Sequence, residues 1–521
     1  MQVKGALDAR WWAALALALA LVILINPLGF IGGGWDDWQY LMAARCWAEH
    51  GPCLPRTHWE GRWPVFVPIA GLFSLFGDNR TTLGLWPLAA SAASLVLLVL
   101  VGNKLIGRPV GWLASLLLLV TPAFSIQLFD PSVEALEFAF ILGGTLCILK
   151  WLENRSIGAA IMAGLSFGMA FQVRETSLIA ALFAAIFVAT RRPRMIDIIA
   201  ALFGFAFPLA VELITYGMIT GDPLFRRRLS LAHTQIPSSE LLASVDSRRS
   251  PFFNKAYIAN WRFEPGVHLH WTIDAFANLF VNAKAGLSLT LTPLILVVGK
   301  GQLQPKDRNA ALKLYGFALL YASILIYALA IDPKARMMFV PLAASCIALA
   351  LLVGALWQMG RRLLPAVAVA MHALLGLTIL FVHQRTDIIE PFAAQWIGAL
   401  PGKIEVDPNT RRHLALVEGA DGLQGLESDS EYLIYNSTER CALWLRRAKV
   451  PRGAIVVVAD KPITQIGRAL SDAGGALCLF RYQRPMSADA VRAAIRRSRP
   501  DGRYILNPRI YLGTARPGSV S

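Results

Sequence analysis

Residues 83–103 read LGLWPLAASAASLVLLVLVGN and contain no charged side chain. A run of about 20 mostly apolar residues is long enough for a helix to cross the hydrocarbon core of a bilayer. Similar runs recur along most of the chain, and they predict an all-α membrane domain with about eleven transmembrane helices. The predicted spans lie at roughly 11–31, 83–103, 110–129, 133–152, 157–173, 176–190, 196–217, 275–298, 313–331, 336–357 and 363–383.

The composition of the 521-residue chain agrees with a membrane protein. Hydrophobic residues make up 55% and charged residues 16%, and the mean hydropathy is +0.50. A soluble domain carries about 25% charged residues, so the composition excludes a conventional soluble enzyme and a disordered protein. The six cysteines are too few for a secreted disulfide scaffold. The net charge of +16 favours contact with membrane lipids rather than nucleic acid, because no nucleic-acid-binding motif is present.

The distribution of lysine and arginine predicts the orientation of the spans. With the N-terminus in the cytoplasm, the cytoplasmic segments hold 15 basic residues, whereas the short outer loops hold only Arg174, Lys334 and Arg336. We therefore predict a multi-pass protein of the bacterial inner membrane, with loops 32–82 and 218–274 and the C-terminal tail in the periplasm. The three outer basic residues depart from the positive-inside rule, so topology does not explain their presence.

The tail differs in pattern from the rest of the chain. Strand-like runs at Tyr432–Tyr435 and Ala454–Ala459 alternate with helix-like runs at Ile463–Ala473 and Ala488–Arg499. This alternation is typical of a small α/β domain. We therefore predict two domains, a transmembrane domain at 1–383 and a soluble α/β domain on the outer face at 384–521.

Two pairs of cysteines fall in segments predicted to face the periplasm. Cys46 and Cys53 share the first outer loop, and Cys441 and Cys478 share the tail. Both pairs could form disulfides in an oxidising compartment. No C-x-x-C pattern indicates a metal site.

An acidic pair follows the first span directly. Asp36 and Asp37 stand in the segment GGGWDDWQY, residues 32–40, beside apolar and aromatic residues. Carboxylates are costly at a membrane boundary, and a neighbouring like charge or partial burial raises the pKa of such a group. The pair could therefore act as a general base or hold a divalent cation. Its structural alternative is to cap the helix expected over 38–50.

Several short motifs lie at the outer ends of the predicted spans. They read Asp36-Asp37, Tyr40, Arg62-Trp63-Pro64, Leu75-Phe76-Gly77, Phe129-Asp130-Pro131, Phe171–Glu175 and Ala335–Pro341. This pattern resembles the GT-C class of membrane glycosyltransferases, in the branch of protein O-mannosyltransferases and the aminoarabinose and Rgt-type transferases. The acidic pair of that family is commonly Asp-Glu and here is Asp-Asp. Its basic residue often directly precedes a proline, whereas Arg62 stands one position earlier.

The resemblance implies a chemistry and a set of residue roles. A sugar would move, with inversion, from a polyprenyl-phosphate donor to an envelope glycan such as lipopolysaccharide, a lipid or a protein on the periplasmic face. The base would take a proton from the acceptor hydroxyl, and fixed cations would stabilise the leaving phosphate. The implied residues are Asp36, Asp37 and Asp130 for catalysis; Arg62, Arg174, Arg336 and Lys334 for the donor phosphate; and Tyr40, Glu60 and Glu175 for substrate binding.

Each assignment has a structural alternative. Arg174 could pair with Glu175 as an interface anchor, and Lys334 and Arg336 could extend to lipid head groups. Asp130 could end a helix. The run Arg226–Arg228 in the second large outer loop is expected to contact lipid phosphate or a charged acceptor.

Two other classes of function stay open at this point. A transporter or flippase for a lipid-linked glycan would place ionisable residues inside its spans. Glu134, Glu137 and Glu212 are the main residues of this kind. The third possibility is a non-catalytic assembly or receptor subunit that works through the tail domain.

Overall fold

The computed structural model describes residues 9–25, 35–107, 109–232, 270–329, 331 and 334–387, together with five strands between residues 404 and 514. Several predicted features lie outside these residues. They are the glycines of 32–34, the side chain of Asp37, the pair Cys441 and Cys478, and both helix-like runs of the tail.

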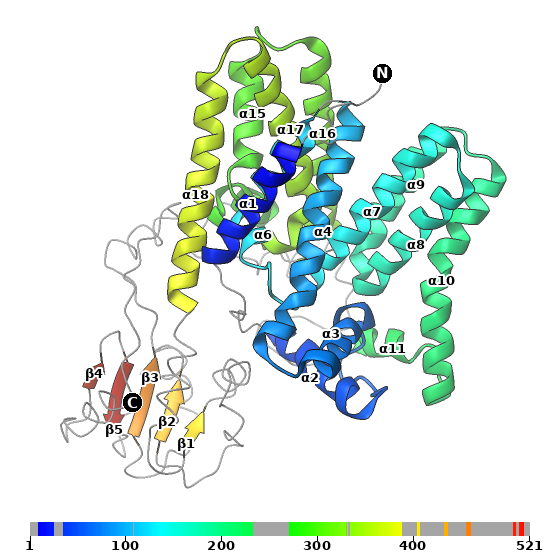
Figure 1. The fold of residues 1–521 in the computed structure, drawn as a ribbon, viewed down its shortest axis with the longest axis vertical. Helices are drawn as coiled ribbons and strands as arrows, with labels where there is room; N and C mark the ends of the chain where they lie inside the picture. Colours follow the sequence, from blue (N-terminus) through cyan, green and yellow to red (C-terminus); the bar gives the residue numbers. More distant parts are fainter. Residues whose placement is uncertain are drawn as a thin grey trace.

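Helices occur in every one of the predicted spans (Figure 1). Six of the described helices are long and apolar enough to cross a membrane, and the protein is a membrane protein. The other predicted spans coincide with shorter apolar helices, so the number of crossings stays a prediction. The helices are α1 Ala9–Ile25, α4 Arg80–Ile106, α5 Val110–Leu119, α6 Pro122–Ser125, α7 Val133–Asn154, α8 Ile157–Val173, α9 Leu178–Ala189, α10 Met195–Thr220, α14 Trp271–Val281, α15 Ser288–Val298, α16 Pro305–Ser323, α17 Phe339–Gln358 and α18 Leu363–Asp387.

The prediction of one continuous span at 275–298 is wrong. The helix breaks between α14 and α15, where Gly286 has φ +70° and its backbone approaches His372 of α18 so closely that a Cβ would lie 2.8 Å from the ring. The N–H of Leu287 donates to Nδ1 of His372 at 3.1 Å, so Nε2 carries the proton and donates to the carbonyl of Leu117 at 2.9 Å. The buried histidine thus satisfies two backbone groups at the break.

The helices differ strongly in how much of their surface other helices cover. Almost all of α17 is buried, so it forms the centre of the bundle, whereas most of α10 is exposed. Small residues bring α8 and α10 together: a Cβ on Gly164 would lie 1.9 Å from the carbonyl oxygen of Ala201, and one on Gly204 would lie 2.2 Å from that of Ile161. Close backbone approach of this kind is typical of helices that pack within a membrane.

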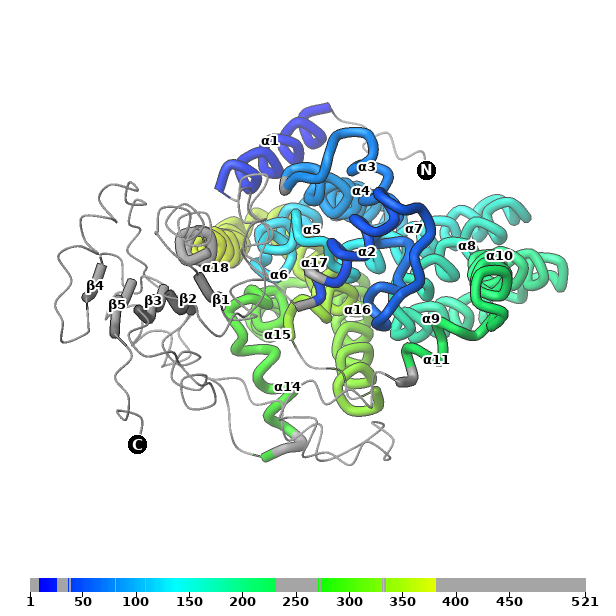
Figure 2. The backbone as a smooth tube through the Cα atoms, turned by 90° about the horizontal axis from the view of Figure 1, so that it is seen from below, coloured from blue at the N-terminus to red at the C-terminus, as the bar shows by residue number. Residues whose placement is uncertain are grey.

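Short helices gather at one end of the bundle. There, α2 (Trp35–His50) and α3 (Trp63–Phe76) lie across the ends of the long helices, with α11 (Phe225–Ala232) nearby, as the view onto this end shows (Figure 2). Two 3₁₀ turns, η1 (Glu175–Ser177) and η5 (Ala335–Met338), also lie at the boundaries of long helices. The remaining short elements are the 3₁₀ turn η3 (Ala283–Ala285) and the π turn η4 (Ile324–Ala328).

Of the two possible disulfides, the one in the first outer loop is present. Cys46 and Cys53 are bonded, and this bond closes the turn that follows α2. Helix α2 is also joined to the start of α4, because Arg45 of α2 pairs with Asp78. The side chain of Asn79 then caps α4 by accepting a hydrogen bond from the N–H of Thr82 at 2.9 Å.

A five-stranded sheet occupies the tail. Both predicted strand runs are confirmed within one residue. The strand order is β1-β2-β3-β5-β4, with β1 to β3 parallel and β5 antiparallel to its two neighbours. The division of the chain at residue 384 stays a prediction. The strands are β1 Ile404–Val406, β2 Tyr432–Tyr435, β3 Ile455–Ala459, β4 Tyr504–Leu506 and β5 Ile510–Thr514.

Candidate active site

Two buried glutamates stand at the start of α7. Glu134 lies in the first turn, where the positive end of the helix dipole favours a carboxylate, and Glu137 follows on the same face. Glu134 is 4% exposed and Glu137 is 8% exposed. Buried carboxylates require nearby positive charge or hydrogen-bond donors, so the groups around them decide what this site can do.

Arginines from two distant segments meet these glutamates. Arg336 of η5 places Nε 3.8 Å from Oε1 of Glu134, and its Nη2 lies 3.6 Å from Oδ2 of Asp36 in α2. Arg174, which ends α8, places Nη1 3.7 Å from Oε2 of Glu137. Residues 36, 134, 174 and 336 are thus brought to one place by the ends of four helical segments.

Glu134, Glu137, Arg174 and Arg336 line a cavity of about 300 Å³, a volume that includes open solvent at its mouth, and Asp36 lies beside it against Arg336. One part of its wall is polar and carries both glutamates, both arginines and Thr176. The rest of the lining is mainly apolar and includes Phe138, Phe339, Leu325 and Tyr321. We call Asp36, Glu134, Glu137, Arg174 and Arg336 the cavity cluster.

A second pair connects α2 with α3. The Arg62 guanidinium donates from Nη1 to the hydroxyl of Tyr40 at 2.8 Å. Burial raises the pKa of the Tyr40 hydroxyl above its usual value, so the group is a neutral phenol. Burial alone would lower the pKa of Arg62. Tyr40 and Glu175 outweigh this effect and raise the pKa above its usual value, so Arg62 is always charged.

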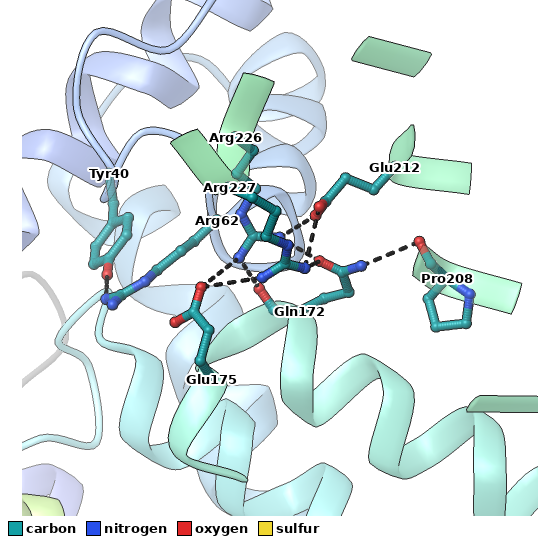
Figure 3. A network of polar contacts seen from close by, with 8 residues as sticks. All are labelled: Tyr40, Arg62, Gln172, Glu175, Pro208, Glu212, Arg226 and Arg227. Atoms are coloured by element: carbon teal, nitrogen blue, oxygen red, sulfur yellow. Dashed lines mark hydrogen bonds and ion pairs between the residues drawn. The ribbon is translucent and has the colours of Figure 1, made fainter. Parts of the chain in front are cut away.

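Another set of ionic contacts holds α11 against α8 and α10 (Figure 3). Arg226 pairs with Glu212 of α10 and donates from Nη2 to the carbonyl of Gln172 at 2.6 Å. Arg227 reaches Oε1 of Glu212 at 3.1 Å and Oε1 of Glu175 at 3.2 Å. Both Arg226 and Glu212 have side chains only 1% exposed. We call Gln172, Glu175, Glu212, Arg226 and Arg227 the α11 cluster.

The pKa of Glu175 reflects these neighbours. Burial would raise it, but Arg62, Arg226 and Arg227 lower it, and the net shift is downward from the usual value of 4.5. Glu175 therefore stays ionised in mildly acidic solution. Because it interacts with both Arg62 and Arg227, it links the α2–α3 pair to the α11 cluster.

The structure places the residues named from the sequence in three groups. Asp36, Arg174 and Arg336 belong to the cavity cluster, and Tyr40, Arg62 and Glu175 lie next to it. Asp130 is half-buried in the turn before α7, and Lys334 is exposed at the start of η5. Glu60 closes a local turn by accepting a hydrogen bond from the N–H of Arg56 at 2.7 Å. None of these last three lines the cavity.

Glu134 and Glu137 are site residues that none of the sequence motifs contains. Their signal was the presence of two acids inside an otherwise apolar span. The expectation that Arg226 and Arg227 contact lipid or acceptor is wrong, because the buried Glu212 of α10 pairs with both of them. Arg228, the third member of that run, is exposed and pairs with Asp222.

A divalent cation between the acids of this site stays a prediction, and it would have to share their oxygens with a guanidinium group. Arg336 already contacts the carboxylates of both Asp36 and Glu134. A guanidinium in that position competes with a metal ion for the same oxygens. Cys46, His50 and Cys53 also lie close together, but both of those sulfurs are in the disulfide.

Residues 64–215 match the family model of dolichyl-phosphate-mannose-protein mannosyltransferases. The match covers the chain from α3 through most of α10. It confirms the resemblance to GT-C class membrane glycosyltransferases that the motifs indicate. No curated protein sequence matches the chain.

Two solved structures are similar to this chain at low sequence identity. One is the oligosaccharyltransferase AglB of Archaeoglobus fulgidus, solved with an inhibitory peptide and a dolichol phosphate. It is 12% identical, with a TM-score of 0.43, over 83% of this chain and 63% of that one. The other is ArnT of Cupriavidus metallidurans bound to undecaprenyl phosphate, 12% identical with a TM-score of 0.34 over 99% of both chains. This chain thus spans less than two thirds of the archaeal protein.

Proposed function

We propose that the protein is a membrane glycosyltransferase that moves a sugar from a polyprenyl-phosphate donor to an acceptor hydroxyl. The observation that carries the proposal is the meeting of Asp36 and Arg336, 300 residues apart in the chain, within 3.6 Å beside a cavity that also holds Arg174. A carboxylate and fixed guanidinium groups are the two chemical requirements of this reaction. The match of residues 64–215 to mannosyltransferases supports the same class.

The proposed reaction is a single displacement. Asp36 removes the proton of the acceptor hydroxyl, and the resulting oxygen attacks the anomeric carbon of the donor. The bond from that carbon to the phosphate oxygen breaks, and polyprenyl phosphate leaves with the electron pair. Attack from the side opposite the phosphate inverts the anomeric carbon. Asp37 and Asp130 are proposed as assisting acids.

Arginine is suited to the phosphate because its planar guanidinium binds two oxygens at once. Arg336 lies between Asp36 and Glu134, so it can contact a phosphate while it remains close to the base. Arg174 and Arg62 are proposed as further phosphate ligands, with Lys334 at the entrance. Tyr40, Glu60 and Glu175 are proposed to bind substrate. The site and the tail are proposed to face the periplasm of a bacterial inner membrane.

The test is the substitution Asp36→Asn in a strain that lacks the chromosomal copy. Mass spectrometry of its envelope glycans and glycolipids identifies the sugar that is missing, and plasmid-borne variants are then assayed for its return. A general base contributes about 10²–10⁴-fold, so we expect Asp36→Asn to lower the initial rate of transfer in isolated membranes by that factor. Binding of undecaprenyl phosphate should be retained.

The matched control is Asp78→Asn. Asp78 precedes α4 and pairs with Arg45 away from the cavity, so its loss should leave the rate near that of the wild type. Transfer at the wild-type rate by Asp36→Asn would contradict the proposal. If that variant also lost export of a lipid-linked glycan, the transporter hypothesis would replace it.

A further inference from the structure

We propose that the turn after α2 is a zinc site under redox control: once its disulfide is reduced, Cys46, His50 and Cys53 bind one Zn²⁺. The three ligand atoms, which are the two sulfurs and a ring nitrogen of the histidine, all lie within 4.8 Å of one another. None of the three residues lines the cavity. The inference therefore concerns a second site and does not depend on the proposed transfer reaction.

The spacing Cys-x₃-His-x₂-Cys places the three ligands on the same side of the turn. Cys46 and His50 stand four residues apart at the end of α2, and residues at this spacing share one face of a helix. Gly51 follows with φ +75°, a conformation that suits glycine, and reverses the chain. The reversal brings Cys53 back to the face that carries the other two ligands.

Contacts other than the disulfide also hold this turn. The N–H of Gly51 donates to the carbonyl of Trp47 at 3.1 Å, and Nε1 of Trp47 donates to the carbonyl of Cys53 at 3.2 Å. The Trp47 ring packs edge-on against Phe66 of α3, with centroids 5.5 Å apart. Reduction changes none of these groups, so we expect the two thiols to stay close together. A ligand set that is already arranged loses less conformational entropy when it binds.

The site is accessible, and its histidine has a carboxylate beside it. The side chain of His50 is 71% exposed, and both cysteines are half-buried, so a metal ion and a reductant can reach them. Nδ1 of His50 lies 3.8 Å from Oε2 of Glu49. A carboxylate next to one ring nitrogen favours the tautomer in which the other nitrogen, here Nε2, binds the metal.

The oxidised and reduced states differ in what the sulfurs can bind. A dithiol reductant passes two electrons and two protons to the disulfide, which becomes two thiols while the reductant becomes a disulfide. Zn²⁺ then replaces both thiol protons, which are released, and bonds to two thiolates and one neutral imidazole. This ligand set suits zinc, with water in the fourth position of a tetrahedron. Because disulfides persist in oxidising compartments, zinc binds only where such a reductant is supplied.

The experiment measures metal binding by the full-length protein in detergent micelles, in an oxidised and a reduced sample. A phosphine serves as the reductant, because a dithiol would itself bind metal, and it is removed without air. Co²⁺ is the first probe, since its bonds to thiolates give a charge-transfer absorption, and Zn²⁺ should then displace it. We expect one equivalent of metal for each reduced chain and none at this turn in the oxidised protein.

Paired variants separate this site from the other thiols of the chain. The double variant Cys46→Ser with Cys53→Ser should lose the charge-transfer absorption. The matched control is Cys441→Ser with Cys478→Ser, which removes the two cysteines of the tail and should keep the absorption. Circular dichroism and size-exclusion profiles establish that both variants are folded.

His50→Asn tests the third ligand at an exposed side chain and leaves both thiols in place. Loss of a group that only orients a metal-binding histidine already costs about 10–100-fold in affinity. Loss of the histidine itself should therefore raise the Kd for Zn²⁺ by at least about tenfold. Competition with a chromophoric chelator measures this Kd.

Several results would overturn the inference. They are a reduced wild type that binds no Co²⁺, an oxidised protein that binds Zn²⁺ as tightly at this turn, an undiminished absorption in the Cys46 and Cys53 double variant, and an unchanged Kd in His50→Asn. All of them leave the proposed function standing, because Asp36→Asn tests transfer separately.

Discussion

The cavity cluster and the α11 cluster contain the same kinds of side chain and meet at the α8–α9 junction through the adjacent residues Arg174 and Glu175, yet their contacts differ. In the α11 cluster, Arg226 donates a hydrogen bond of 2.6 Å to the carbonyl of Gln172, and Arg227 forms an ion pair of 3.1 Å with Glu212. In the cavity cluster, the charged atoms are 3.6–3.8 Å apart. The α11 cluster is held mainly by short contacts among its own members, although Nε of Arg226 has no hydrogen-bond partner in the described structure, whereas the cavity cluster has longer contacts and lines a cavity. We therefore expect the α11 cluster to stabilise the fold and the cavity cluster to bind a ligand.

The largest expected change in stability is in the α11 cluster. Arg226→Met leaves Glu212 buried in α10 without its main partner. Breaking one side of a buried ion pair costs about 3–5 kcal/mol, so we expect the free energy of unfolding in detergent micelles to fall by that amount. Circular dichroism during denaturant titration measures it.

Two controls keep this result interpretable. Arg228→Met changes the same helix at a side chain that is 68% exposed, and it should have little effect. The double variant Arg226→Met with Glu212→Met removes both charges, so it should recover most of the lost stability. A single variant as stable as the wild type would show that the α11 cluster does not stabilise the fold.

In the cavity cluster, replacing a charged side chain by methionine should instead raise the free energy of unfolding. Glu134→Met removes a buried carboxylate that lacks hydrogen-bond donors in the described structure, and Arg336 keeps its contact with Asp36. An unsatisfied buried polar group costs about 1–3 kcal/mol. We therefore expect stability to rise by about 1 kcal/mol while transfer falls. If Glu134→Met lowered the stability as much as Arg226→Met, both clusters would stabilise the fold, and the proposed difference between them would be wrong.

The sequence predicted the positions of the spans well because apolar length is a local property. It also predicted that Asp36, Arg174 and Arg336 share one face, since basic residues outside the cytoplasmic loops are rare and the motif resemblance pointed to the same residues. The break at Gly286 was missed. It depends on a contact with His372, and no local pattern contains that information.

The sequence did not predict which acidic side chains pair with which arginines. Glu134, Glu137 and Glu212 looked alike as acids within spans. The structure gives the first two a cavity and the third a buried arginine. Likewise Arg226 and Arg228 stand two positions apart in one basic run, but only the first is buried. Helix packing decides these differences, and a single sequence records it only indirectly.

The smallest expected effect concerns Glu175, which connects the two regions. Its pKa in the folded protein is below 4.5, so its contribution to stability is present above that pH and is lost as the pH falls through the folded value. The side chain is 40% exposed, and solvent screening limits the contribution to about 1 kcal/mol or less. The stability difference between the wild type and Glu175→Gln should therefore be constant near neutrality and shrink only once the pH falls below the usual glutamate value of 4.5. Glu153→Gln, whose pair with Lys104 joins α4 and α7, serves as the control. A difference that disappeared already between pH 5 and 6 would mean that the arginines do not hold Glu175 ionised, and the α11 cluster would then be less closed than its distances indicate.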